Sequence, residues 1–305
     1  MDFGFLPDLE TVDFRLPPDH PDTVRQLNLN AREVAVLPAF YIGAPQWLNK
    51  EWLGTLYPAT AKDKEFLHHY ARQFNTIELN TTYYRIPDEA TIKRWRAAVS
   101  PEFRFCPKFP QLISHEKLLT GAEDLTTAFC DAVLGLEENL GVCFLQLPPV
   151  FGPKSLPILE KFILSLPEAL PLAVEFRHPA WFTDFEAGRE AFAILEACRV
   201  GTVLTDVAGR RDVLHMRLTT PTVFLRFNGY QQHPSDFTRV DAWVQRFKTW
   251  FQEGLQTVYF FMHQHHAQDI PPMVQYLIAQ LKDVCQLDVS YLCKPLPQEI
   301  QGKLF

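Results

Sequence analysis

The stretch Pro171-Leu-Ala-Val-Glu-Phe-Arg-His-Pro179 decides the fold that we expect for this chain. Its alternation places Val174 and Phe176 on one face of a strand and Glu175 and Arg177 on the other. Similar patterns recur along the chain at intervals of roughly 20 to 40 residues, with helical patterns in most of the gaps. This repetition is typical of a parallel sheet whose strands are connected by helices.

Eight such strand patterns follow one another. They cover residues 40–44, 76–84, 103–109, 142–148, 171–179, 202–206, 222–228 and 257–263. Eight strands alternating with helices favour an α/β fold of the TIM (β/α)8 barrel type over an open doubly wound sheet, and no Gly-rich phosphate loop opens any of the helices. Only about 15 residues separate the sixth and seventh strands, which is too short for a full crossover helix. We therefore predict that a loop replaces the sixth helix.

The chain divides into three parts on this basis. Residues 1–38 are an N-terminal extension that is rich in Pro, Asp and Leu and has no clear period. Residues 39–284 form the barrel, and residues 285–305 form a C-terminal tail. We expect the extension to lie draped over the barrel.

Composition excludes several classes of protein. The net charge is -7 without a basic stripe, so generic binding to nucleic acid or to anionic membranes is not expected. Six cysteines occur without a Cys-x-x-Cys pair, which favours buried reduced thiols. The acidic N-terminus lacks a secretory signal and no long apolar window occurs, so we predict a cytoplasmic protein without a membrane segment. The oligomeric state stays open.

Polar residues follow the strands at one end. In a barrel, side chains of one parity face the helices and those of the other face the axis. Assigning the apolar parity to the helices leaves an axial set near the carboxyl ends of the strands, where the active sites of such barrels lie. Its members are Glu78, Asn80, Lys108, Gln146, Glu175, Arg177, Asp206, Arg226, Asn228 and His263.

The charges of this axial set allow two interpretations. Its three acids match its three Lys and Arg residues in number, so an internal network of salt bridges could plug the axis. Hydrophobic layers fill an axis at lower cost, because burying charges costs several kcal/mol each unless they are paired. The second interpretation is a polar pocket in which Lys and Arg hold an anionic group and a carboxylate or His moves protons.

Several segments resemble the YecE-like family, the domain of unknown function 72. They are Tyr41 to Gly43 with Trp47, Phe74 to Arg85, Phe105 to Lys108, Ser114-His115, Leu145 to Pro149 and Ala173 to Trp181. The resemblance runs from about Tyr41 to the last helix. It implies a barrel similar to the metal-dependent endonuclease and sugar isomerase type, without an established activity. Its signature polar residues fall on Glu78, Asn80, Lys108, His115, Gln146, Glu175, Arg177, His178, Asp206 and Arg226.

The leading hypothesis is an uncharacterised YecE-like enzyme, a hydrolase or isomerase, that binds a small anionic ligand at the carboxyl ends of the strands. The ligand would be phosphorylated or carboxylated, and sugar- or nucleotide-like. Lys108, Arg177 and Arg226 would hold its anionic group. The other residues expected to bind it are Trp47, Asn80, Tyr84, Gln146, His178, Asp206, Asn228 and His263.

Three side chains are candidates for proton transfer. Glu78 or Glu175 would act as general acid or base. His115 is the third candidate. It directly follows Ser114, and neighbours in sequence rarely orient as a nucleophile and its base, so we favour His115 alone over the pair.

Two alternative functions remain open. One is a metal-dependent phosphodiesterase or isomerase, in which His263 and the three acids of the axial set would be ligands. The nearby Lys and Arg would repel a cation, so no metal or cofactor is predicted and a divalent metal stays an alternative. The other is a non-catalytic binding or scaffold protein, suggested by the acidic surface and the N-terminal extension.

Overall fold

Eight parallel strands form the centre of the computed structural model, which describes residue 4 and residues 6–29, 37–294 and 296. The strands are β1 (Ala39–Gly43), β2 (Thr76–Leu79), β3 (Arg104–Pro107), β4 (Cys143–Gln146), β5 (Leu172–Glu175), β6 (Gly201–Asp206), β7 (Thr222–Asn228) and β8 (Thr257–His263). Six of them form one parallel sheet in the order β1-β8-β7-β6-β5-β4, and β2 pairs with β3 in a second sheet. The predicted alternation of parallel strands and helices is thus confirmed.

Backbone hydrogen bonds join the two sheets at both edges. On one side, the amide of Glu78 in β2 donates to the carbonyl of Ala44, just beyond β1, at 3.2 Å. On the other side, the amide of Gly141, just before β4, donates to the carbonyl of Phe105 in β3 at 2.7 Å. The short β2–β3 sheet therefore lies between the two outer strands of the larger one.

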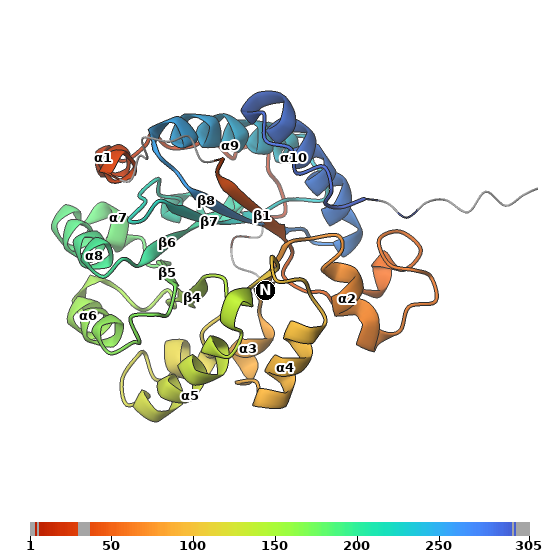
Figure 1. Cartoon of the computed structure of the whole chain (residues 1–305). Coiled ribbons are helices and arrows are strands. Elements are labelled where there is room, and N and C mark those ends of the chain that lie inside the picture. Colours follow the sequence, from red (N-terminus) through yellow and green to blue (C-terminus); the bar gives the residue numbers. More distant parts are fainter. Residues whose placement is uncertain (1–3, 5, 30–36, 295, 297–305) are drawn as a thin grey trace, which may run out of the picture.

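Helices surround the strands (Figure 1). Their bounds are α1 (Pro21–Leu29), α2 (Phe66–Tyr70), α3 (Thr81–Tyr84), α4 (Glu89–Ala97), α5 (Glu123–Leu134), α6 (Leu156–Leu164), α7 (Ala180–Thr183), α8 (Phe185–Ala197), α9 (Pro234–Glu253) and α10 (Ile270–Cys285). Helix α9 is amphipathic, because Val240, Trp243, Val244 and Phe247 recur at helical spacing and are all fully buried. No helix of the described residues has both the length and the apolar character needed to span a membrane.

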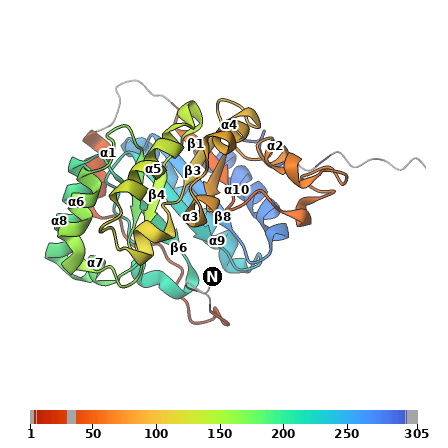
Figure 2. The ribbon, with the colours of Figure 1, turned by 90° about the horizontal axis from the view of Figure 1, so that it is seen from below.

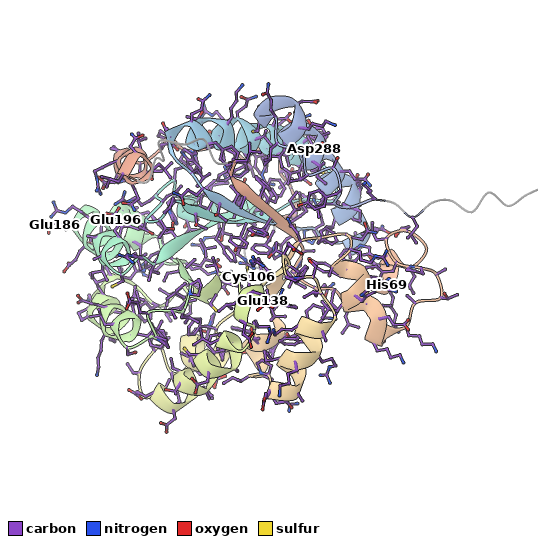
Figure 3. The ribbon with its side chains drawn as sticks, in the orientation of Figure 1. His69, Cys106, Glu138, Glu186, Glu196 and Asp288 are labelled. Carbon is purple, nitrogen blue, oxygen red and sulfur yellow. The ribbon has the colours of Figure 1, made fainter. Side chains whose placement is uncertain are left out.

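A small apolar cluster fills the space between the two sheets. It contains Cys106, Phe144, Ala173, Val203, Phe224, Tyr259 and Phe261, which come from β3 to β8. The rings of Phe144 and Phe224 lie 5.1 Å apart, and Cys106 lies near the middle of the view in Figure 3. Because side chains alternate along a strand, the next residue but one in each strand faces the same space. We call this side of the strands the inner face.

The connection between β6 and β7 contains a 3-10 segment, η6 (Ala208–Val213), and no α-helix, which confirms the predicted loop. In Figure 1, α1 lies between α8 and α9, where a helix following β6 would stand. The buried hydroxyl of Thr23 in α1 donates to the carbonyl of Met216 at 2.7 Å and accepts from the amide of Leu218 at 2.9 Å. The N-terminal extension therefore supplies the helix that the sixth connection lacks.

Helix α1 was not predicted, although two signals for it are present. Pro21 stands at its first position and Asp22 lies in its first turn, both of which are typical of a helix start. Arg25 of α1 also pairs with Glu196 of α8 at 3.0 Å. Figure 3 labels Glu196, which lies on the side of α8 nearest to α1. The apolar period is short, with Thr23 and Leu27 as the buried residues, so the sequence pattern alone gave no clear helix.

The strand predicted over residues 76–84 is too long. Strand β2 ends at Leu79, and α3 follows from Thr81. The buried hydroxyl of Thr82 shares its proton between the carbonyl of Leu79, at 2.9 Å, and that of Lys108, at 2.8 Å. These two bonds satisfy carbonyls at the ends of β2 and β3, and they turn the chain away from the sheet.

Candidate functional site

A network of buried polar side chains crosses the inner face at the carboxyl ends of the strands. Arg226 of β7 donates to Glu78 of β2 from Nε and Nη2, each at 2.9 Å. The same guanidinium donates from Nη1 to Oε2 of Glu175 in β5 at 3.1 Å. His263 Nε2 at the end of β8 lies 2.9 Å from Oε2 of Glu78. The pairing network that the sequence offered as one interpretation is therefore present.

The network continues towards β3. Arg177 Nε donates to Oε1 of Glu175 at 2.9 Å, and Gln146 Nε2 donates to its Oε2 at 2.7 Å. Lys108 Nζ donates to Oε1 of Gln146 at 2.9 Å and lies 4.1 Å from the centre of the Tyr83 ring. We call the connected set the polar network. It consists of Glu78, Asn80, Lys108, Gln146, Glu175, Arg177, Arg226 and His263.

The two carboxylates of the polar network are held ionised. Burial alone would raise the pKa of Glu78, but the charges of Arg226 and His263 outweigh it and hold that pKa well below its usual range. Burial would also raise the pKa of Glu175, yet Arg177 and Arg226 lower it to about 2. Neither carboxyl carries a proton to donate at neutral pH.

Two basic side chains of the site are shifted in the opposite sense. Burial, reinforced by the charge of Arg226, lowers the pKa of the Lys108 ammonium to about 8. Burial and the charge of Lys108 lower the pKa of His115 to about 4, so its imidazole is neutral at pH 7. His115 Nδ1 lies 2.8 Å from the Ser114 hydroxyl, and its ring meets Tyr83 edge to face at 5.4 Å.

A cavity of about 340 Å³ borders the polar network and is lined in part by its Arg177, Arg226 and His263. Polar side chains at the strand ends and apolar side chains of the segment that precedes α1 both line it. Figure 2 shows the segment that precedes α1 below the strands, at the end where this cavity lies. The lining includes Leu6, Leu9, Phe14, Asn80, Arg177, Val207, Arg226, Asn228, Tyr230, Arg239, His263 and Gln264. We call this cavity the pocket. The polar network therefore does not fill the carboxyl end of the strands completely.

The inward orientation expected for Asp206 is wrong. Asp206 faces α9, where its carboxylate accepts from Arg239 Nη2 at 2.8 Å and from the indole of Trp243 at 2.7 Å, and it also accepts from Arg211. The inward residue of β6 near this end is Thr205, which shares its parity with Val203 of the inner apolar cluster. The acids and fixed cations of the axial set are then no longer equal in number.

The polar network keeps two carboxylates, Glu78 and Glu175, against three fixed cations. Those cations are Lys108, Arg177 and Arg226. The only oxygen within hydrogen-bond reach of Lys108 Nζ among the described residues is that of neutral Gln146. Positive charge is therefore in excess on the inner face beneath the pocket.

Four other predicted site residues lie outside the polar network. Trp47 packs edge to face on Trp95 of α4 at 5.8 Å. Tyr84, which was expected in a strand, is 72% exposed at the end of α3. His178 accepts from the amide of Ala180 in a turn before α7. Asn228 lines the pocket, but its side chain donates to the carbonyl of Arg226 at 3.3 Å.

Of the four metal ligands in the alternative hypothesis, the structure brings His263 and Glu78 into contact and leaves the other two apart from them. Arg226 lies between Glu78 and Glu175, and Asp206 faces away from both. Among the described residues, no group of three or more His, Cys, Asp or Glu side chains is arranged to hold a metal ion.

Sequence reasoning missed part of the pocket. Arg239, one of these residues, reaches the pocket from α9. Its guanidinium lies 4.3 Å from the centre of the Phe227 ring and donates to the carbonyl of Asn228 at 3.0 Å. Its position in a helix gave no signal, since the axial set was drawn from strands alone. The sequence could not predict Leu6, Leu9 and Phe14 as lining residues either, because their segment has no periodicity.

Comparison with known proteins gives a consistent result. Residues 41–299 match the family model described as protein of unknown function DUF72. The UPF0759 protein YecE of Escherichia coli K12 is 33% identical over 260 residues, which cover 79% of this chain and 92% of that protein. Two crystal structures of a DUF72 family protein from Enterococcus faecalis V583 are similar in fold, with TM-scores of 0.63 and 0.61 at 20% and 18% identity. They cover 82% of this chain and 99% and 96% of theirs.

Proposed function

Because this chain belongs to the DUF72 family, whose name states no activity, we propose its function from the geometry of the pocket. We propose that the eight strands close into a TIM-type barrel and that the chain is an enzyme acting on a small anionic ligand at their carboxyl ends. The backbone hydrogen bonds at both edges of the two sheets support the closure. The ligand would carry a phosphate or carboxylate group on a sugar- or nucleotide-like body.

The excess of positive charge carries this proposal. Arg226 and Arg177 both line the pocket, and each is already oriented by a carboxylate of the polar network. A guanidinium held in this way presents its positive charge to the pocket without further ordering of the side chain. Lys108 adds a buried charge behind them. Such a preorganised cationic surface binds phosphate or carboxylate with little loss of side-chain entropy.

The proton-transfer group that the contacts favour is His263. Its side chain is 16% exposed and lines the pocket, whereas Glu78 behind it is fully buried. A carboxylate that contacts one nitrogen of an imidazole orients the ring. Glu78 would thus act through His263, while Glu175 would position Arg177 and Arg226.

Binding of sulfate to the purified protein tests the first part of this proposal. Calorimetric titration should give saturable binding at one site, and Arg177→Met should weaken it at least tenfold. Arg25→Met, which removes a half-exposed arginine in α1, should leave the affinity unchanged. No binding of sulfate or inorganic phosphate at millimolar concentration would contradict the proposal.

The enzymatic part needs the natural ligand. Native mass spectrometry of protein purified without added anions should detect a bound small molecule, and NMR should then show whether the protein converts it. His263→Gln should abolish conversion and leave sulfate affinity within about threefold, since the arginines remain in place. If the variant converts the ligand at the normal rate, His263 does not transfer the proton.

A further inference from the structure

The lining of the pocket is of two chemical kinds. Asn80, Arg177 and His263 contribute polar groups to it, and Leu6, Leu9 and Phe14 of the N-terminal segment contribute apolar ones. We propose that the segment formed by Gly4 and residues 6–15, which we call the N-terminal strap, is a specificity-determining wall. The ligand is then an amphipathic anion, with its phosphate or carboxylate on the arginines and a short apolar or aromatic body against the strap. This inference rests on the proposed anion binding.

Backbone contacts fix the beginning of the strap. The carbonyl of Gly4 accepts from the amide of Gly209 in η6 at 2.9 Å. A Cβ atom on Gly209 would lie 2.8 Å from that carbonyl oxygen, and one on Gly4 would lie 2.7 Å from a methyl group of Val207. Gly4 also has a φ of +75°, which other residues rarely adopt. The close approach therefore depends on glycine at both positions.

Arginine side chains fix the end of the strap. Arg211 Nη2 donates to the carbonyls of Phe14 and Arg15 at 3.2 and 3.1 Å. The guanidinium of Arg239 lies 5.1 Å from the centre of the Phe14 ring. Both arginines are themselves held by Asp206. The outward-facing acid of β6 therefore supports the apolar wall of the pocket.

The chain on the far side of the strap is also anchored. Arg246 of α9 donates to the carbonyl of Pro17 at 3.3 Å and pairs with Asp19. Helix α1 follows, with Leu27 fully buried. The strap is therefore held at both ends and spans the carboxyl ends of the strands, and it is not a tail that merely touches the surface.

The strap leaves room for a ligand. The cavity that the strap borders has a volume of about 340 Å³, and small-molecule sites begin at about 300 Å³. The strap therefore bounds the pocket without filling it. The DUF72 family model begins at residue 41, so this wall lies outside the part of the chain that matches the family. The strap would adapt the family's domain to a ligand with an apolar part.

Paired ligands that differ only in their apolar part test the wall. The probes are inorganic phosphate against phenyl phosphate, and acetate against benzoate, titrated calorimetrically at fixed pH. The wild-type protein should bind the phenyl compound of at least one pair about tenfold more tightly or better, because burial of a ring on an apolar wall contributes at least this factor. The pair that shows the preference identifies the anionic group.

Variants of the strap assign that preference to the wall. Leu6→Asn and Leu9→Asn should each reduce the ratio of the two affinities at least threefold and leave the affinity for the small anion unchanged. Leu29→Asn is the matched control, because Leu29 lies in the same N-terminal extension but is 71% exposed. Leu6 is only half-buried, so its substitution keeps the test valid if Leu9→Asn unfolds the protein.

The outcomes separate the two proposals. Equal affinities for the members of both pairs in the wild type would overturn the wall, even if the anions bind. An unchanged preference in folded Leu6→Asn would overturn it as well. If none of the four compounds binds, the proposed anion-binding function fails, and the wall fails with it.

Discussion

Arg226 and Glu78 form a two-bond ion pair that joins β7 to β2, with both N–H···O distances at 2.9 Å. These strands belong to different sheets, and the two residues are separated by 148 positions in the sequence. Glu78 has no exposed surface, and Arg226 is 7% exposed. The pair therefore links the two sheets in a region that water hardly reaches, where a charge without its partner is costly.

Removal of Arg226 should destabilise the fold strongly. Arg226→Met leaves Glu78 and Glu175 buried without this cation, which should lower the free energy of unfolding by about 3–5 kcal/mol. Lys93→Met is the control, because Lys93 pairs with Glu89 on the surface of α4. Its replacement should change the free energy of unfolding little. Urea unfolding followed by circular dichroism measures both changes. Equal effects would show that the buried pair has no special importance.

Two tryptophans of α9 provide a matched pair of substitutions. Trp243 and Trp250 are both fully buried, and the indole N–H of Trp243 donates to Asp206 at 2.7 Å. The indole N–H of Trp250 has no hydrogen-bond partner among the described residues. Trp243→Phe should therefore cost about 1.5–3 kcal/mol more than Trp250→Phe, the value of a hydrogen bond to a charged group. Chemical unfolding of both variants gives the difference directly.

Anion binding should depend on pH through Lys108. Its pKa is lowered to about 8, so its positive charge is present below that pH and lost as the pH rises through it. Sulfate carries the same charge throughout this range. Its affinity should fall between pH 7 and pH 9, by about tenfold at most, since roughly one amine in ten is still charged one unit above its pKa. Lys108→Met should bind sulfate more weakly, and its affinity should not fall between pH 7 and pH 9. A fall of the same size in this variant would show that another group causes the pH dependence.

Stability in acid should depend on Glu175. Its folded pKa of about 2 lies below the ordinary 4.5, so the carboxylate stabilises the fold above pH 4.5 and this contribution is lost as the pH falls towards 2. Between pH 5 and pH 3 the loss from this group should be about 2 kcal/mol. Glu175→Gln should be less stable at pH 5 and should lose correspondingly less on acidification. Urea unfolding at the two pH values compares the slopes, and equal slopes would refute the assignment.

The strands and most of the polar network could be predicted from the sequence. The segments containing Glu175 and Arg226 alternate clearly between apolar and polar residues, so the polar parity could be assigned to the inner face. Asp206 could not be assigned in this way. Its strand carries Val203 on one face and Leu204 on the other, both buried, so apolarity does not distinguish the two faces.

The partners of Asp206 explain why this error could not be corrected locally. Arg239 and Trp243 lie 33 and 37 positions further along the chain, in a helix whose apolar period gives no reason to expect a buried salt bridge. The position of the strap was even harder to predict from the sequence. Its residues have no period, and their place over the pocket depends on contacts with Gly209 and Arg211, about 200 positions away.

The position of α1 has a consequence for biosynthesis. Thr23 bonds to Met216 and Leu218, residues that the ribosome adds 193 and 195 positions later. Helix α1 also packs against α9, so its docking surface is complete only after α9 has left the exit tunnel. Leu27 remains without its native packing until then, so the nascent chain exposes an apolar side chain during most of translation, when chaperones can bind it.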